Sequence, residues 1–150
     1  MPDICARLES ENEKTNSTKF IAWFDRYLAQ SYKAIMGRGE EHVFLSGNDC
    51  YALRCVMLHE GASNISSQRL QETLSHFHFT VVGSHCNQFN SVLQLDVPTF
   101  CNDVCNAVDR WLGDFKALHA NKLHRLDTLL RIHVGTHEIS PGVVFQGGGT

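Results

Sequence analysis

Hydrophobic residues recur at helical spacing in three long segments of the chain. The first segment places Phe20, Phe24 and Leu28 on one stripe, and this spacing predicts an amphipathic helix. The longest stripe belongs to the third segment, where apolar residues continue from Phe100 to Phe115. Stripes this continuous favour burial, so we expect the helices to pack around one core. The predicted core helices are residues 18–36, 48–60 and 98–118.

The predicted core contains side chains from both the first and the third of these helices. We expect its members to be largely buried, because leaving such stripes in water would cost free energy. These residues are Phe24, Leu28, Val104, Val108, Trp111 and Leu112.

Between the second and third helices, the periodicity changes from helical to alternating. Phe77, His78, Phe79 and Thr80 alternate between apolar and polar side chains, which is typical of a β-strand. A second segment rich in strand-forming residues follows a polar loop. We therefore expect a small β-hairpin within residues 77–97, inserted into an otherwise helical chain.

Length and composition indicate one folded unit with less regular ends. The chain has 150 residues, of which 43% are hydrophobic and 19% charged, as expected for a single domain with its own core. Residues 1–16 are polar and charged, and we expect them to be flexible. Residues 17–134 form the predicted single, mostly helical domain, and the glycine-rich residues 135–150 form a loop-rich tail. The predicted fold class is therefore mainly α, a helical bundle with a small hairpin insertion.

Charge and hydropathy narrow the classes of partner. The formal net charge is −3, so a nucleic acid would have to bind a local patch rather than a broadly basic surface. No apolar run is long enough to span a bilayer, and the polar start of the chain lacks the core of a signal peptide. We expect a cytoplasmic protein without a membrane partner. Its six cysteines are then expected to be buried thiols rather than disulfides.

The most informative chemical feature is the pair Arg54 and His59 near the end of the second predicted helix. A guanidinium can hold a phosphate in a planar fork, and a histidine can move a proton at neutral pH. Together they suggest metal-free cleavage of RNA. Five residues rotate an ideal helix by about 500°, so the two side chains start roughly 140° apart. A long arginine side chain, a frayed turn before Gly61 or a second copy of the chain must bring them together.

The residues around this pair resemble the R-x(4–6)-H signature of HEPN domains, all-helical proteins of bacterial defence and toxin systems. An apolar helix runs through Leu53 into Arg54, and Gly61 follows closely after His59. The resemblance implies metal-independent endoribonuclease chemistry at the arginine and the histidine, with no cofactor. It also implies a homodimer in which two facing motifs build one composite cleft. Cys55 stands where the family often has asparagine, so the alternative within the family is a catalytically silent relative that only binds.

The chemistry needs a group that removes the proton from a ribose 2′-hydroxyl and a cation that stabilises charge on the phosphoryl oxygens. His59 is the candidate base or acid, and Arg54 is the candidate electrostatic clamp. Asp49, Tyr51 and Glu60 flank the pair and are candidate supporting residues, of which Tyr51 is the better helical neighbour of Arg54. The expected partners are RNA, a second copy of the chain, and a cognate antitoxin or other partner protein.

Two other interpretations remain open. In one, the chain is a non-enzymatic interaction protein, and Arg54 and His59 have structural roles. In the other, it is a small phosphodiesterase of the two-histidine type, using His78 and Thr80 from one face of a strand. A second match to that histidine motif is missing. The histidine- and cysteine-rich stretch 76–86 lacks the paired spacing of a zinc site, so no metal is predicted.

Overall fold

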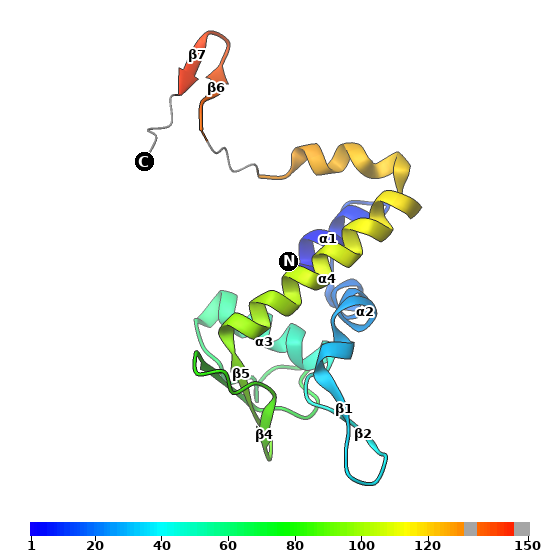
Figure 1. Ribbon diagram of the computed structural model, residues 1–150, viewed down its shortest axis with the longest axis vertical. Coiled ribbons are helices and arrows are strands. Elements are labelled where there is room, and N and C mark those ends of the chain that lie inside the picture. The colour runs from blue at the N-terminus through cyan, green and yellow to red at the C-terminus, as the bar shows by residue number, and fades with distance from the viewer. Residues whose placement is uncertain (131–134, 146–150) are drawn as a thin grey trace.

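The computed structural model describes residues 1–130 and 135–145, which form helices and short strands (Figure 1). Of the described residues, 48% are in helices and 19% in strands, so the fold is mixed α/β and the predicted helical bundle is wrong. The helices are α1 (Pro2–Glu9), α2 (Ser17–Tyr27), α3 (Gly47–Glu60) and α4 (Val97–Leu118), with the 3-10 helices η1 (Ala29–Tyr32) and η2 (Ala120–Thr128). The strands are β1 (Lys33–Ile35), β2 (Glu41–Val43), β3 (His76–Thr80), β4 (Asn87–Phe89), β5 (Val92–Asp96), β6 (His137–Ser140) and β7 (Val143–Phe145).

Capping residues fix the ends of α3 and α4, the two helices whose bounds were predicted best from the sequence. Ser46 caps α3 by accepting a hydrogen bond from the backbone of Asp49, and Gly61 ends it in the left-handed conformation with a φ of 63°. Asp96 caps α4 by accepting from the backbone of Thr99. The predictions of helices over 48–60 and 98–118 are therefore confirmed within a residue at each end.

The predicted helix over 18–36 is wrong in its second half. The α-helix ends at Tyr27, and the chain then turns through η1 into strand β1, which pairs antiparallel with β2. Gly39 permits the tight return between these strands because its φ is 82°. The backbone N–H of Phe44 also donates to the carbonyl of Tyr32 at 2.8 Å. Cross-strand pairing thus supplies the hydrogen bonds that a longer helix would have made.

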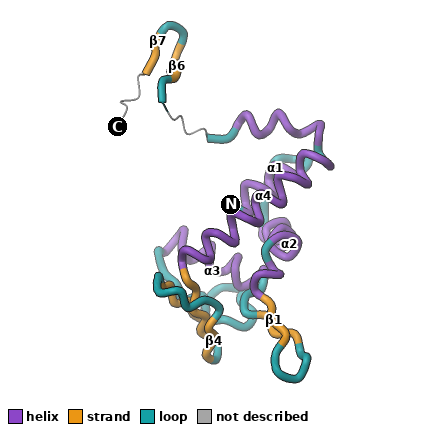
Figure 2. The backbone as a smooth tube through the Cα atoms, viewed as in Figure 1, coloured by secondary structure: helices purple, strands orange, loops and turns teal. Residues whose placement is uncertain are grey.

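The predicted hairpin within 77–97 has a different topology. Strands β3 and β5 are parallel, with Phe77 opposite Leu93, and β4 joins the far side of β5 in antiparallel register. The connection after β3 therefore passes to the outer position before the chain returns as the central strand. Figure 2 shows this small sheet next to the start of α4. The only hairpin in the three-stranded sheet is formed by β4 and β5.

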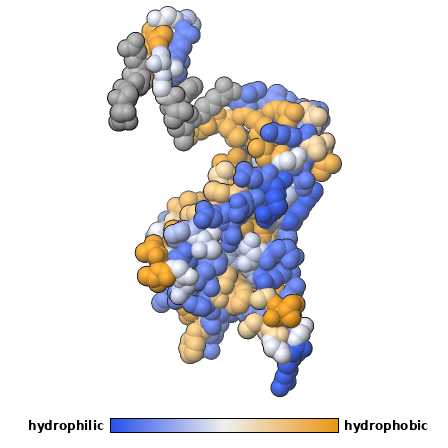
Figure 3. All heavy atoms as spheres, in the orientation of Figure 1, coloured by the Kyte–Doolittle hydropathy of each residue, from blue (hydrophilic) through white to orange (hydrophobic). Residues whose placement is uncertain are grey.

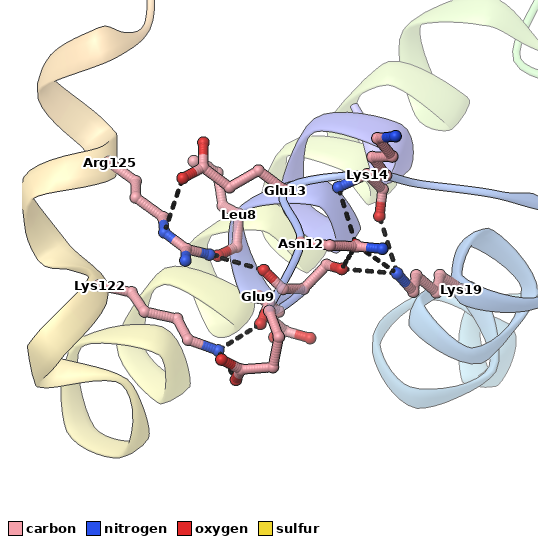
Figure 4. Close-up of polar contacts among 10 residues, drawn as sticks. Leu8, Glu9, Asn12, Glu13, Lys14, Lys19, Lys122 and Arg125 are labelled. Atoms are coloured by element: carbon pink, nitrogen blue, oxygen red, sulfur yellow. Dashed lines mark hydrogen bonds and ion pairs between the residues drawn. The ribbon is translucent and has the colours of Figure 1, made fainter.

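The N-terminal residues, expected to be flexible, contain the helix α1 with Cys5 and Leu8 buried in the core. Two cations from η2 hold its C-terminal end (Figure 4). Lys122 donates to the carbonyl of Glu9 at 2.6 Å, and Arg125 donates to the carbonyl of Leu8 at 2.8 Å. These carbonyls lack partners within the helix, so the contacts cap α1 from outside.

The core lies between the four α-helices and the inner face of the β3–β5–β4 sheet. Phe24, Leu28 and Trp111 are buried as expected, whereas Val104, Val108 and Leu112 are only half-buried. The side of α4 that faces the core is centred on Ala107, Trp111 and Phe115. Val104, Val108 and Leu112 therefore lie at the border of that side. The prediction that they are largely buried holds only in part, because they pack against the core from its edge.

The surface mixes apolar and polar residues on the face drawn in Figure 3. All six cysteines are free; Cys5 and Cys50 are buried, but Cys101 and Cys105 are exposed. The tail, expected to be loop-rich, contains the antiparallel pair β6–β7, and the predicted domain end at residue 134 lies outside the described residues. None of the helices in the described part of the chain combines the length and hydrophobicity needed to cross a bilayer.

Candidate functional site

Helix α3 carries both residues of the candidate pair. The helix continues to Glu60 and ends at Gly61, so no frayed turn separates Arg54 from His59. The helical offset of roughly 140° between their starting directions therefore remains. Arg54 is half-buried and His59 is exposed in the last turn. One chain does not bring the two side chains together on one face of the helix.

Arg54 forms an ion pair that the sequence did not reveal. Its Nε donates to Oδ2 of Asp3 in the first turn of α1 at 2.9 Å. Its guanidinium carbon lies 6.0 Å from the ring centroid of Tyr51, which is within the range of a cation–π contact. Burial acts to lower the pKa of Arg54, but the hydrogen bond and charge of Asp3 raise it above its usual value. The guanidinium is thus charged and joins α1 to α3.

An apolar pocket opens beside this ion pair. It has a volume of about 280 Å³ and lies between α1, α2, α3 and α4. Arg54 and Asp3 are the charged side chains in its wall, while His59 does not line it. The apolar part of the wall includes Phe20, Leu53, Met57, Phe100 and Val104.

Of the supporting residues, Asp49 has a different environment from the one expected. Its carboxylate is 1% exposed and accepts hydrogen bonds from the backbone N–H groups of Glu72, Thr73 and Leu74. These bonds fix the loop before β3, which makes Asp49 a structural residue. Burial, followed by the neighbouring Cys55, raises the pKa of Tyr51, so its hydroxyl stays protonated at neutral pH.

The alternative pair His78 and Thr80 lies on the outer face of β3. The rings of His76 and His78 are 5.5 Å apart, beside a groove of about 680 Å³. The Oγ1 of Thr80 accepts a hydrogen bond from the backbone of Val82. Among the described residues, no lysine or arginine lines this groove. A phosphate there would have no lysine or arginine side chain to balance its charge.

A partly buried polar cluster joins η1, the loop after β3 and α4. Tyr32 donates to Oδ2 of Asp103 at 3.2 Å, and Nε2 of His85 lies 3.8 Å from the same oxygen. The neighbouring Cys86 has a φ of 55°, and burial together with the charge of Asp103 raises its pKa to about 11. A thiol with that pKa is a poor nucleophile at neutral pH, so we assign the cluster a structural role. No local sequence signal connects residues this far apart.

Comparisons with known proteins do not add to this picture. A scan against family models and searches of curated proteins and solved structures gave no match for this chain. Within residues 1–130 and 135–145, no group of three or more histidine, cysteine, aspartate or glutamate side chains is placed to hold a metal ion. A functional assignment must therefore rest on the chemistry of the site.

Proposed function

We propose that the chain is a metal-independent endoribonuclease whose active site forms between two copies. The observation that carries this proposal is the exposed apolar surface inside the motif itself. Met57 and Leu58 lie between Arg54 and His59, and they are 49% and 66% exposed. A second copy packed against their outer side, beside the pocket that they also line, would remove apolar surface from water and bring His59 towards the partner's α3. The resemblance to HEPN domains supports the same chemistry and a cytoplasmic role in a bacterial defence or toxin system.

In this proposal each group has one task. The imidazole of His59 takes the proton from a ribose 2′-hydroxyl, whose oxygen then attacks the adjacent phosphorus. The bond from phosphorus to the 5′-oxygen breaks, and a solvent water protonates that oxygen while the imidazolium of His59 returns its proton to bulk water. Arg54 stabilises the charge that develops on the phosphoryl oxygens. The products are a 2′,3′-cyclic phosphate and a free 5′-hydroxyl.

The test is cleavage of single-stranded RNA by purified protein in the presence of EDTA. His59→Ala should lower the rate by roughly 10²–10⁴-fold, because proton transfer is lost. Arg54→Ala should be comparably damaging, and Arg54→Lys should restore only part of the rate because lysine lacks the planar fork. The matched control is His78→Ala, which removes an exposed histidine from β3 and should leave cleavage unchanged.

A mixing experiment tests whether the site is shared. Two inactive variants, Arg54→Ala and His59→Ala, are combined after exchange of subunits. If each site takes its arginine and histidine from different copies, half of the dimers are mixed and each has one intact site. Activity should then recover to about a quarter of the wild-type value. Folded variants that cleave RNA like the wild type would refute the nuclease, and no recovery on mixing would refute the shared site.

A second function is favoured by the ion pair between Arg54 and Asp3. In this alternative the chain is a non-enzymatic interaction protein, and Arg54 holds α1 against α3. Its partner would be a cognate antitoxin or another protein that covers the apolar surface around Met57. This alternative predicts that Arg54→Ala lowers stability, that His59→Ala has no effect, and that wild-type protein leaves RNA intact.

A further inference from the structure

We propose that the pocket beside Arg54 is a nucleotide subsite, and that the Asp3 carboxylate occupies its phosphate position when no RNA is bound. This inference rests on the proposed ribonuclease function and names how the site recognises and admits its substrate. It assigns Asp3, a residue outside the sequence motif, a direct influence on substrate binding.

The first support is the chemistry of the ion pair. Arginine binds carboxylate and phosphate oxygens through the same planar array of N–H groups. Asp3 bonds to Nε of Arg54 at 2.9 Å, so its carboxylate stands where a phosphate oxygen would be held. The side chains of Arg54 and Asp3 are 31% and 24% exposed, so an anion from solvent can reach the pair. Exchange of one oxyanion for the other would keep the guanidinium paired.

The second support is the pocket that adjoins the guanidinium. Its volume of about 280 Å³ suits one planar base rather than a base pair, and its wall is mainly apolar. Phe20 and Phe100 provide aromatic surface, and bases pack readily against such rings in single-stranded RNA recognition. A phosphate at Arg54 with its base in the pocket would use the charged and the apolar parts of the wall together. The substrate class that follows is RNA with an unpaired base.

The third support is the way α1 is attached. Its body is held by the buried Cys5 and Leu8, and its C-terminal end by Lys122 and Arg125 (Figure 4). Asp3 lies at the opposite end, in the first turn. Rotation of this one side chain vacates the phosphate position while the attachments of α1 remain intact. Asp3 therefore competes with substrate, and its removal should strengthen binding.

The test compares wild-type protein with Asp3→Asn and with the matched control Asp109→Asn, which removes one carboxylate from the exposed face of α4. The probes are a single-stranded RNA oligonucleotide, its duplex, a nucleoside 3′-monophosphate and inorganic phosphate. Asp3→Asn should bind the single strand about tenfold or more tightly, whereas Asp109→Asn should stay within about twofold of wild type. The duplex should gain less than the single strand. Binding of the nucleoside 3′-monophosphate shows whether the subsite recognises a nucleotide without the rest of the RNA.

A pocket-filling variant separates the base from the phosphate. Val104→Trp should weaken the binding of the single strand and the nucleotide but leave the response to inorganic phosphate. That response is read from the Nε–H resonance of Arg54 by NMR in Asp3→Asn protein, so it does not depend on catalysis. Thermal unfolding of each variant verifies that it is folded.

The outcomes distinguish this inference from the nuclease. Tighter nucleotide binding by Asp3→Asn without cleavage by any variant supports the subsite and refutes the nuclease. Cleavage by wild type that needs Arg54, with binding unchanged in Asp3→Asn, refutes the subsite and keeps the nuclease. An Arg54 resonance that does not respond to phosphate or nucleotide in Asp3→Asn also refutes the subsite. Binding of the nucleotide no tighter than inorganic phosphate refutes the role of the pocket.

Discussion

Replacing Lys122 with methionine should destabilise the protein, because the ammonium group of this lysine caps the C-terminal end of α1. Lys122 is 5% exposed and donates to the carbonyl of Glu9 at 2.6 Å and to the carboxylate of Glu11. Methionine keeps most of the apolar stem but leaves the carbonyl without this donor. Glu11 is 89% exposed, so most of the loss comes from the carbonyl contact. A hydrogen bond to a charged group contributes about 1.5–3 kcal/mol, which is the expected decrease in the free energy of unfolding.

Urea denaturation followed by circular dichroism measures this change. For a domain of this size, the expected loss corresponds to a decrease in melting temperature of about 3–12 °C. The dependence of the unfolding free energy on urea should also fall if α1 detaches before the rest unfolds. A Lys122→Met variant within about 0.5 kcal/mol of wild type would refute the reasoning, because that is the range of an unimportant surface change.

The contact between Lys122 and Glu11 gives the cap at the C-terminal end of α1 a pH dependence. The hydrogen bond and charge of Lys122 lower the pKa of Glu11 from its ordinary value of 4.5. A lowered pKa in the folded state gives stability that is present above the unfolded value and lost as pH falls through the folded one. Wild type should therefore lose more stability on acidification below about pH 4.5 than Glu11→Gln does. Equal acid sensitivity of the two proteins would show that the pair contributes nothing.

Three further predictions concern the core and the thiols. Asp49→Ala should cost about 2–5 kcal/mol in urea denaturation, because three backbone N–H groups lose their acceptor; a variant as stable as wild type would contradict this role. Val108→Asp should cost only about 1–3 kcal/mol because Val108 is half-buried, whereas Ala107→Asp should unfold the protein because Ala107 is 0% exposed. Thermal melts that rank these two variants in the opposite order would refute the assigned face of α4. Cys86 should react with a thiol reagent at pH 8 more slowly than Cys101, since burial and Asp103 raise the pKa of Cys86 to about 11 while Cys101 is exposed. Mass spectrometry of the modified peptides measures both rates, and equal rates would contradict the burial of Cys86.

The elements that could be predicted from sequence depend on neighbouring residues. Helix α3 follows a serine cap and stops at a glycine, and both signals lie within the segment itself. The parallel pairing of β3 with β5 could not be predicted, because the alternation that marks a strand does not specify its partner or direction. The hydrogen bond by which Lys122 caps α1 could not be predicted either, since Lys122 and its carbonyl partner are 113 positions apart.

The candidate site could likewise be predicted from the sequence only in part. The helical offset between Arg54 and His59 follows from their spacing, and the uninterrupted α3 preserves it. The partner of Arg54 is 51 positions away in the first turn of α1, so the ion pair with Asp3 required the tertiary structure. Closeness to the motif makes Asp49 a candidate supporting residue, but its hydrogen bonds to the loop before β3 explain its position better.

The contacts of Lys122 and Arg125 with α1 also determine when folding can be completed during synthesis. The carbonyls at the end of α1 accept hydrogen bonds from Lys122 and Arg125, which the ribosome adds more than a hundred residues later. A nascent chain that already contains α3 therefore lacks the contacts that hold α1 at its far end. Until η2 emerges, α1 is held only by its contacts with the other elements, such as the ion pair of Asp3 with Arg54 and the burial of Cys5 and Leu8. Both ends of α1 are thus attached only after η2 has been made.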